Sequence, residues 1–88
     1  MLARVRLVGR GTPEDPYRVP LPTYRIVEVD YEKRVAIVEV PDWYFTDEEG
    51  RITPRLNVAR LRRLYPAWYE REYEKHKKIL EGVELWRA

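Results

Sequence analysis

Few side chains in this sequence could carry out chemistry, and their types set narrow limits on what that chemistry could be. The chain contains no Cys and no Ser, so the two commonest covalent nucleophiles are absent. His76 is the single histidine, which excludes a metal site built from several histidines. His76 falls on the apolar stripe of a predicted helix, where a packed or half-exposed side chain is a commoner role than catalysis.

Two acidic clusters are the remaining candidates for catalysis or cation binding. They are Glu14 with Asp15 and the acids at 47–49. Both fall in predicted turns, where acids face solvent and cap backbone amides. A glycosidase-like carboxylate pair or a site for a hard cation is the less favoured interpretation. The glycines at 9 and 11 lack the rest of a phosphate-binding loop. We therefore expect no enzymatic activity, no catalytic residue, no cofactor, no metal and no small-molecule substrate.

Arginines form a denser pattern than any of these groups. Residues 51–63 contain five arginines and no acid, and residues 1–13 contain three more, again without an acid. Arginines on a short helix could neutralise phosphates while tyrosines stack on bases. The formal net charge is only +2, and a charge run is commonly just a solvated face. Nucleic-acid binding is therefore the alternative hypothesis, and its candidate residues are Arg55, Arg60, Arg62 and Arg63.

The composition favours one folded domain covering residues 1–88. Hydrophobic residues make up 44% of the chain and charged residues 36%, which suits a small core under a solvated surface. Gln is absent, Asn occurs once, and arginine outnumbers lysine thirteen to four. Few thermolabile residues together with many charges and loop prolines are typical of proteins from hot environments.

The patterning predicts strands first and helices last. Alternation predicts a strand over 2–8 and a β-hairpin over 24–40, and a shorter hairpin follows with arms at 43–45 and 51–53. Asn57 can cap a helix that ends near Leu64, and Pro66 can open a second helix that ends near residue 81. Residues 83–86 can return to the sheet. We expect an α+β domain, a small antiparallel sheet packed with two C-terminal helices.

The inward faces of these elements can also be predicted. With the hairpin turn at 31–34, Val27 opposes Val38 and Val29 opposes Ala36, so one face becomes apolar. The other face is half apolar and needs cover from a helix or a partner. On the second helix, the predicted inward stripe is Tyr69, Tyr73, His76 and Leu80.

A membrane location is not expected. No apolar run approaches the roughly 20 residues needed to cross a bilayer. Residues 1–8 are too short and too charged for a secretory core. The expected location is cytoplasmic, or the virion if the protein is phage-encoded.

Residues 11–22 contain four prolines and form a rigid connector or a presented surface. Within them, Gly-Thr-Pro-Glu-Asp-Pro-Tyr-Arg at 11–18 resembles a Gly-Thr-x-x-Asp/Asn-Pro-Tyr/Phe-Arg segment of small uncharacterised proteins encoded by phages and prophages. The resemblance implies a virion-associated or accessory protein. Our first expectation is thus a non-enzymatic structural or interaction protein that contacts a protein partner, or itself, through Tyr17 and Arg18.

Overall fold

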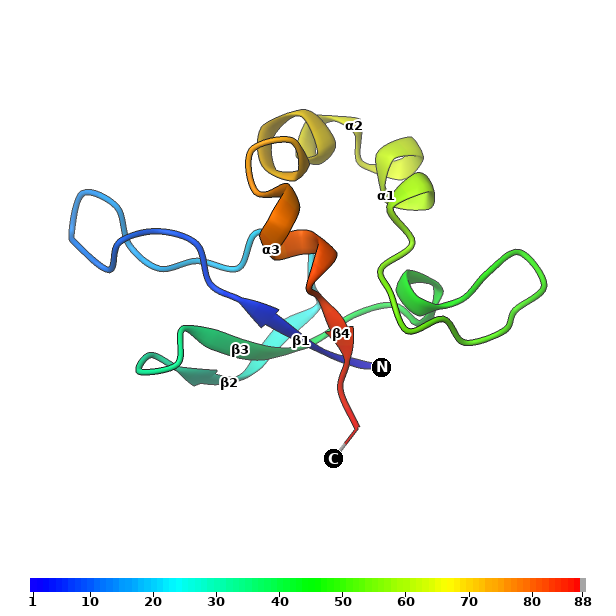
Figure 1. The fold of residues 1–88 in the computed structure, drawn as a ribbon, viewed down its shortest axis with the longest axis horizontal. Coiled ribbons are helices and arrows are strands. Elements are labelled where there is room, and N and C mark those ends of the chain that lie inside the picture. Colours follow the sequence, from blue (N-terminus) through cyan, green and yellow to red (C-terminus); the bar gives the residue numbers. More distant parts are fainter. Residues whose placement is uncertain (88) are drawn as a thin grey trace.

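A four-stranded antiparallel sheet is the base of the fold, and the helices lie on one side of it (Figure 1). The computed structural model describes residues 1–87. The strands are β1 (Leu2–Arg6), β2 (Arg25–Asp30), β3 (Val35–Glu39) and β4 (Glu84–Leu85), in the order β2-β3-β1-β4. The expected α+β architecture is confirmed, including the return of residues 83–86, because β4 pairs with β1.

The hairpin is present, but a β-bulge changes half of its register. Val29 lies opposite Ala36 as predicted, whereas Ile26 and not Val27 lies opposite Val38. The register shifts between Ile26 and Glu28, so Val27 is the additional residue of the bulge. Alternation alone carries no signal for an inserted residue, which is why the pairing of Val27 with Val38 was wrong.

The predicted strand at 43–45 is instead a 3-10 helix, η1 (Asp42–Phe45). Tyr44 and Phe45 are both buried although they are adjacent in sequence. An extended strand would send these two side chains to opposite faces, whereas a helical turn buries both. The following loop closes like a hairpin, with a bridge between Thr46 and Ile52 and with Gly50 at φ +80 as its left-handed residue.

The helical third consists of α1 (Val58–Leu64), α2 (Pro66–Trp68), the π-helical segment η2 (Tyr69–Tyr73) and α3 (Lys77–Glu81). The second predicted helix is thus three segments. Trp68, Glu72 and Leu80 are buried and His76 is half-buried, a spacing of four residues. An α-helix repeats every 3.6 residues, so the wider π turn keeps these side chains on one face. Tyr69 and Tyr73 are only partly buried, so the first half of the predicted stripe was displaced by one residue.

The core lies between the helices and one face of the sheet. Ala3, Val5, Ala36 and Val38 supply the sheet side, and η1, α1 and α3 cover them with Phe45, Leu61 and Leu80. The helices leave the opposite face of the sheet open (Figure 1). Ile37 and Trp86 share a shallow hollow on that face, so the C-terminal segment gives it partial cover.

The proline-rich segment 11–22 is held to the helical half by side-chain donors. Trp68 Nε1 donates to the carbonyl of Pro20 at 2.7 Å, and the Tyr44 hydroxyl donates to the carbonyl of Pro22 at 2.6 Å. Prolines cannot donate from their own nitrogen, so these contacts use the one polar backbone group that each retains. The segment is therefore an integral part of the fold. Among residues 1–87, no helix is both long and apolar enough to cross a bilayer.

Candidate nucleic-acid interface

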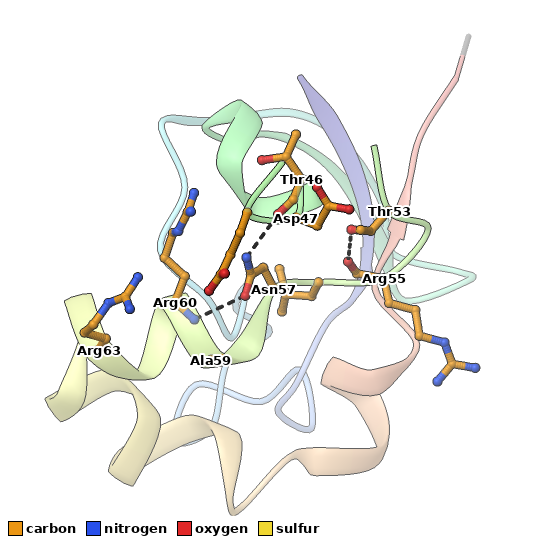
Figure 2. Close-up of a pocket in the computed structure, with 10 residues that line it drawn as sticks. Thr46, Asp47, Thr53, Arg55, Asn57, Ala59, Arg60 and Arg63 are labelled. Carbon is orange, nitrogen blue, oxygen red and sulfur yellow. Dashed lines mark hydrogen bonds between the residues drawn. The ribbon is translucent and has the colours of Figure 1, made fainter. Parts of the chain in front are cut away.

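Helix α1 is positioned by a single asparagine at its start. Asn57 Oδ1 accepts a hydrogen bond from the Arg60 amide at 3.2 Å, and Asn57 Nδ2 donates to the carbonyl of Thr46 at 3.0 Å. The same side chain therefore caps the helix and fastens it to the loop after η1 (Figure 2). Leu61 is fully buried on the inner side of α1, so the polar residues of the helix face outward. The predicted cap at Asn57 is confirmed.

A groove of about 400 Å³ lies between this loop and α1. Its arginines come from two elements: Arg60 and Arg63 project from α1, and Arg55 projects from the segment before it (Figure 2). Asn57 lies between them. The full lining is Thr46, Asp47, Glu48, Thr53, Arg55, Leu56, Asn57, Ala59, Arg60 and Arg63. Three of the four arginines predicted as nucleic-acid ligands thus line the groove, with Arg55 extending away from Arg60 and Arg63 (Figure 2), while Arg62 is not among the lining residues.

The charges in this groove are distributed unevenly. Within residues 1–87, none of the four predicted arginines forms an ion pair, whereas Arg4, Arg18 and Arg25 each pair with a glutamate. On the acidic side, Asp47 Oδ1 accepts from the amides of Glu49 and Arg51 at 3.0 and 2.9 Å. That carboxylate stabilises its own turn. The guanidinium groups are left available to an external anion.

Aromatic rings orient two of these arginines. Arg60 lies over the ring of Trp43, with its guanidinium carbon 5.8 Å from the ring centroid, and Arg62 lies over Tyr69 at 4.9 Å. Trp43 is itself stacked on Tyr65 with an interplanar angle of 14°. Contact with a ring face restricts a guanidinium without neutralising it. Two arginines of α1, Arg60 and Arg62, are therefore each held against an aromatic ring, Trp43 and Tyr69 respectively.

The other predicted contact, Tyr17 with Arg18, is tied into the molecule. Arg18 Nη1 donates to Glu72 Oε1 at 2.7 Å, although the Arg18 side chain remains 45% exposed. Tyr17 is half-buried, with its ring 6.1 Å from that of Tyr31 and beneath the guanidinium of Arg34. Both residues have structural roles in this fold. A contact between them and a partner stays a prediction.

Sequence reasoning missed the pair formed by Glu72 and His76. Glu72 Oε2 lies 3.5 Å from His76 Nε2, and neither atom has a hydrogen-bond partner within residues 1–87. A four-residue spacing between an acid and a histidine on one helix was the available signal. The predicted inward stripe of Tyr69, Tyr73, His76 and Leu80 placed Glu72 on the solvent side of the helix, so the pair was overlooked. The interpretation of His76 as a packed side chain is consistent with its half-buried position.

Two tyrosines in the helical half are perturbed by burial. Desolvation raises the pKa of Tyr44 far above its ordinary value, and the nearby Tyr65 and Tyr24 act in the same direction. Desolvation also raises the pKa of Tyr73, with a further contribution from Glu81. Both phenols are neutral at physiological pH. Residues 1–87 contain no cluster of three or more His, Asp or Glu side chains that could hold a metal ion.

Comparison with protein-family models, with curated proteins and with solved structures finds no match to this chain. The interpretation of the site therefore depends on its residues and their geometry.

Proposed function

We propose that this domain binds nucleic acid through the arginines around α1. The observation that carries the proposal is that Arg55, Arg60 and Arg63 line one groove and form no ion pair within residues 1–87. Guanidinium groups match phosphate geometry with two parallel donors, and several of them in one groove favour a polyanion over a single small anion.

The aromatic residues favour a single strand as the ligand. Tyr65 is partly exposed and stacks on Trp43, which lies beneath Arg60. A base can stack on an aromatic face only when it is not paired and stacked inside a duplex. In this arrangement the arginines neutralise the phosphates and Tyr65 receives a base. Counterions released from the phosphates supply a large part of the affinity.

The test measures binding of a fluorescent single-stranded oligonucleotide, and of the corresponding duplex, as a function of salt. If each of the four arginines contacts one phosphate of a single strand, the logarithm of the binding constant falls with the logarithm of salt with a slope of about −3. The variant in which Arg55, Arg60, Arg62 and Arg63 are all replaced by alanine should lose binding. Tyr65→Ala should lower affinity for the single strand by about tenfold and leave the duplex unaffected.

A matched control separates the site from the overall charge. Replacing Arg6, Arg10, Lys33 and Arg87 by alanine removes four positive charges from elsewhere on the chain, so both quadruple variants start from the same net charge of +2 and lose the same amount. The control should retain most of the affinity. If it weakens binding as much as the α1 variant does, the attraction is unspecific and the proposed site is wrong.

A further inference from the structure

The outer strand of the sheet, β2, and the two residues that flank it carry an unusual concentration of exposed apolar side chains. Of the eight large apolar residues that are exposed within residues 1–87, four lie between residues 24 and 31. They are Tyr24, Ile26, Val27 and Tyr31. Ile26 and Val27 belong to β2, and Tyr24 and Tyr31 lie directly before and after it. Single exposed apolar residues are ordinary, but several gathered at one sheet edge mark an interaction surface.

The backbone of β2 is also open on one side. In the order β2-β3-β1-β4, β2 pairs only with β3, so its other edge presents free N–H and C=O groups. The opposite edge of the sheet is better protected, because β4 has two residues and Glu84 forms a bridge with Arg55. Addition of a strand to β2 would satisfy the free backbone groups and cover the apolar side chains together.

We propose that β2 pairs with β2 of a second copy of this chain, in antiparallel orientation, to form one continuous sheet. Two features of β2 favour a second copy over an arbitrary strand. The first is the bulge at Val27, in the middle of the strand. A bulge normally discourages pairing at an edge, because a regular strand cannot follow the bend. A second copy carries the same bend at its own centre, and a two-fold axis places the two bulges next to each other.

The second feature is the distribution of charge along β2. A two-fold axis between Val27 and Glu28 places Arg25 opposite Asp30 of the second copy, twice. It also places Ile26 opposite Val29 of the second copy. Pairing with β3 puts Arg25 and Asp30 on one face of the sheet, across from Glu39 and Val35, and Ile26 and Val29 on the other. Opposite charges therefore meet on one face and apolar side chains meet on the other.

A matched pair of substitutions tests this surface. Ile26 is 51% exposed and Ile52 is 57% exposed, so Ile→Lys at either position adds the same charge at a similarly accessible site. Light scattering and sedimentation should show a dimer for the wild-type chain. Ile26→Lys should raise its dissociation constant by about a hundredfold, because the change enters the interface twice and loss of one buried Ile is worth about tenfold. Ile52→Lys should leave it unchanged.

Charge exchange provides a second test, and it does not depend on loss of binding. Arg25→Asp places two acids opposite each other in its own dimer, and Asp30→Arg places two arginines opposite each other. Each variant alone should be monomeric, and an equimolar mixture should form a heterodimer. Circular dichroism checks that both variants fold. A monomeric wild type at high concentration, a dimer that survives Ile26→Lys, or a mixture that stays monomeric would each overturn the proposal. Nucleic-acid binding does not enter these measurements.

Discussion

Replacing Arg18 with methionine tests the ion pair between Arg18 and the buried carboxylate of Glu72. The side chain of Glu72 is 10% exposed, so removal of the guanidinium leaves a carboxylate that water can barely reach. Breaking a fully buried pair costs about 3–5 kcal/mol. Because the Arg18 side chain is 45% exposed, we expect about 2 kcal/mol, which for a domain of this size lowers the Tm by roughly 8–16 °C.

The partner substitution completes a double-mutant cycle. Glu72→Gln keeps the shape and the acceptor oxygen but removes the charge, and we expect it to cost about 1 kcal/mol. The double variant, Arg18→Met with Glu72→Gln, should be more stable than the sum of the single effects predicts, by about 1 kcal/mol. Urea unfolding followed by tryptophan fluorescence measures all four free energies of unfolding.

Arg10→Met is the control for this cycle. Arg10 forms an ion pair with Asp15 at 3.6 Å, and its side chain is 85% exposed. Exposed pairs contribute little, so the cost should stay below about 0.5 kcal/mol. If Arg18→Met costs no more than this control, and the cycle shows no coupling, Arg18 does not serve as a structural partner of Glu72. The predicted contact between Arg18 and another protein would then gain support.

Three further outcomes follow from residues outside that pair. Burial raises the pKa of Tyr44, so the stability that depends on the neutral phenol is fully present below the ordinary phenol pKa of about 10 and falls as pH rises above it. Tyr44→Phe loses the hydrogen bond to the Pro22 carbonyl and should lower the free energy of unfolding at neutral pH by about 1 kcal/mol. Urea titrations at a series of pH values should show that this variant also loses less stability at alkaline pH. Gly50 has φ +80 and no atom within 4 Å of an added Cβ, so Gly50→Ala should cost about 1 kcal/mol of stability. Gly9 has φ +102, and an added Cβ would lie 2.3 Å from the Pro16 carbonyl oxygen, so Gly9→Ala should cost clearly more. Equal decreases in Tm for the two variants would contradict this steric argument. Asn57→Ala removes both the cap of α1 and the link to Thr46, so we expect a loss of about 1–2 kcal/mol, and an unchanged melting curve would show that neither bond matters.

The parts of the fold that the sequence predicted are those governed by local rules. Alternation identifies β1 and the hairpin, and Asn57 marks the start of α1, because strand pleating and helix capping depend on neighbouring residues. The bulge at Val27 and the π turn before His76 each insert or displace one residue. Tertiary packing decides such shifts, so a periodic pattern cannot reveal them.

The candidate site was predictable in composition but not in shape. The density of arginines between 51 and 63 pointed to Arg55, Arg60, Arg62 and Arg63. It could not show that three of them line one groove and that Arg62 lies elsewhere, since this depends on how α1 meets the loop after η1. Tyr17 and Arg18 show the reverse case. Their setting between prolines indicated exposure, and Arg18 is 45% exposed, but no local pattern could show that its guanidinium pairs with Glu72, 54 residues along the chain.

The position of β1 in the sheet affects how the chain can fold while it is being synthesised. β1 is made first, yet its two neighbours are β3, at Val35–Glu39, and β4, at Glu84–Leu85. A growing chain can close the hairpin of β2 and β3 and add β1 early, but one edge of β1 stays open until residues 84–85 have left the ribosome. During that interval the apolar face around Ala3 and Val5 lacks Leu80 as cover. Because β4 supplies the second neighbour of β1, a chain arrested before residue 84 exposes an edge of β1 that the folded domain covers.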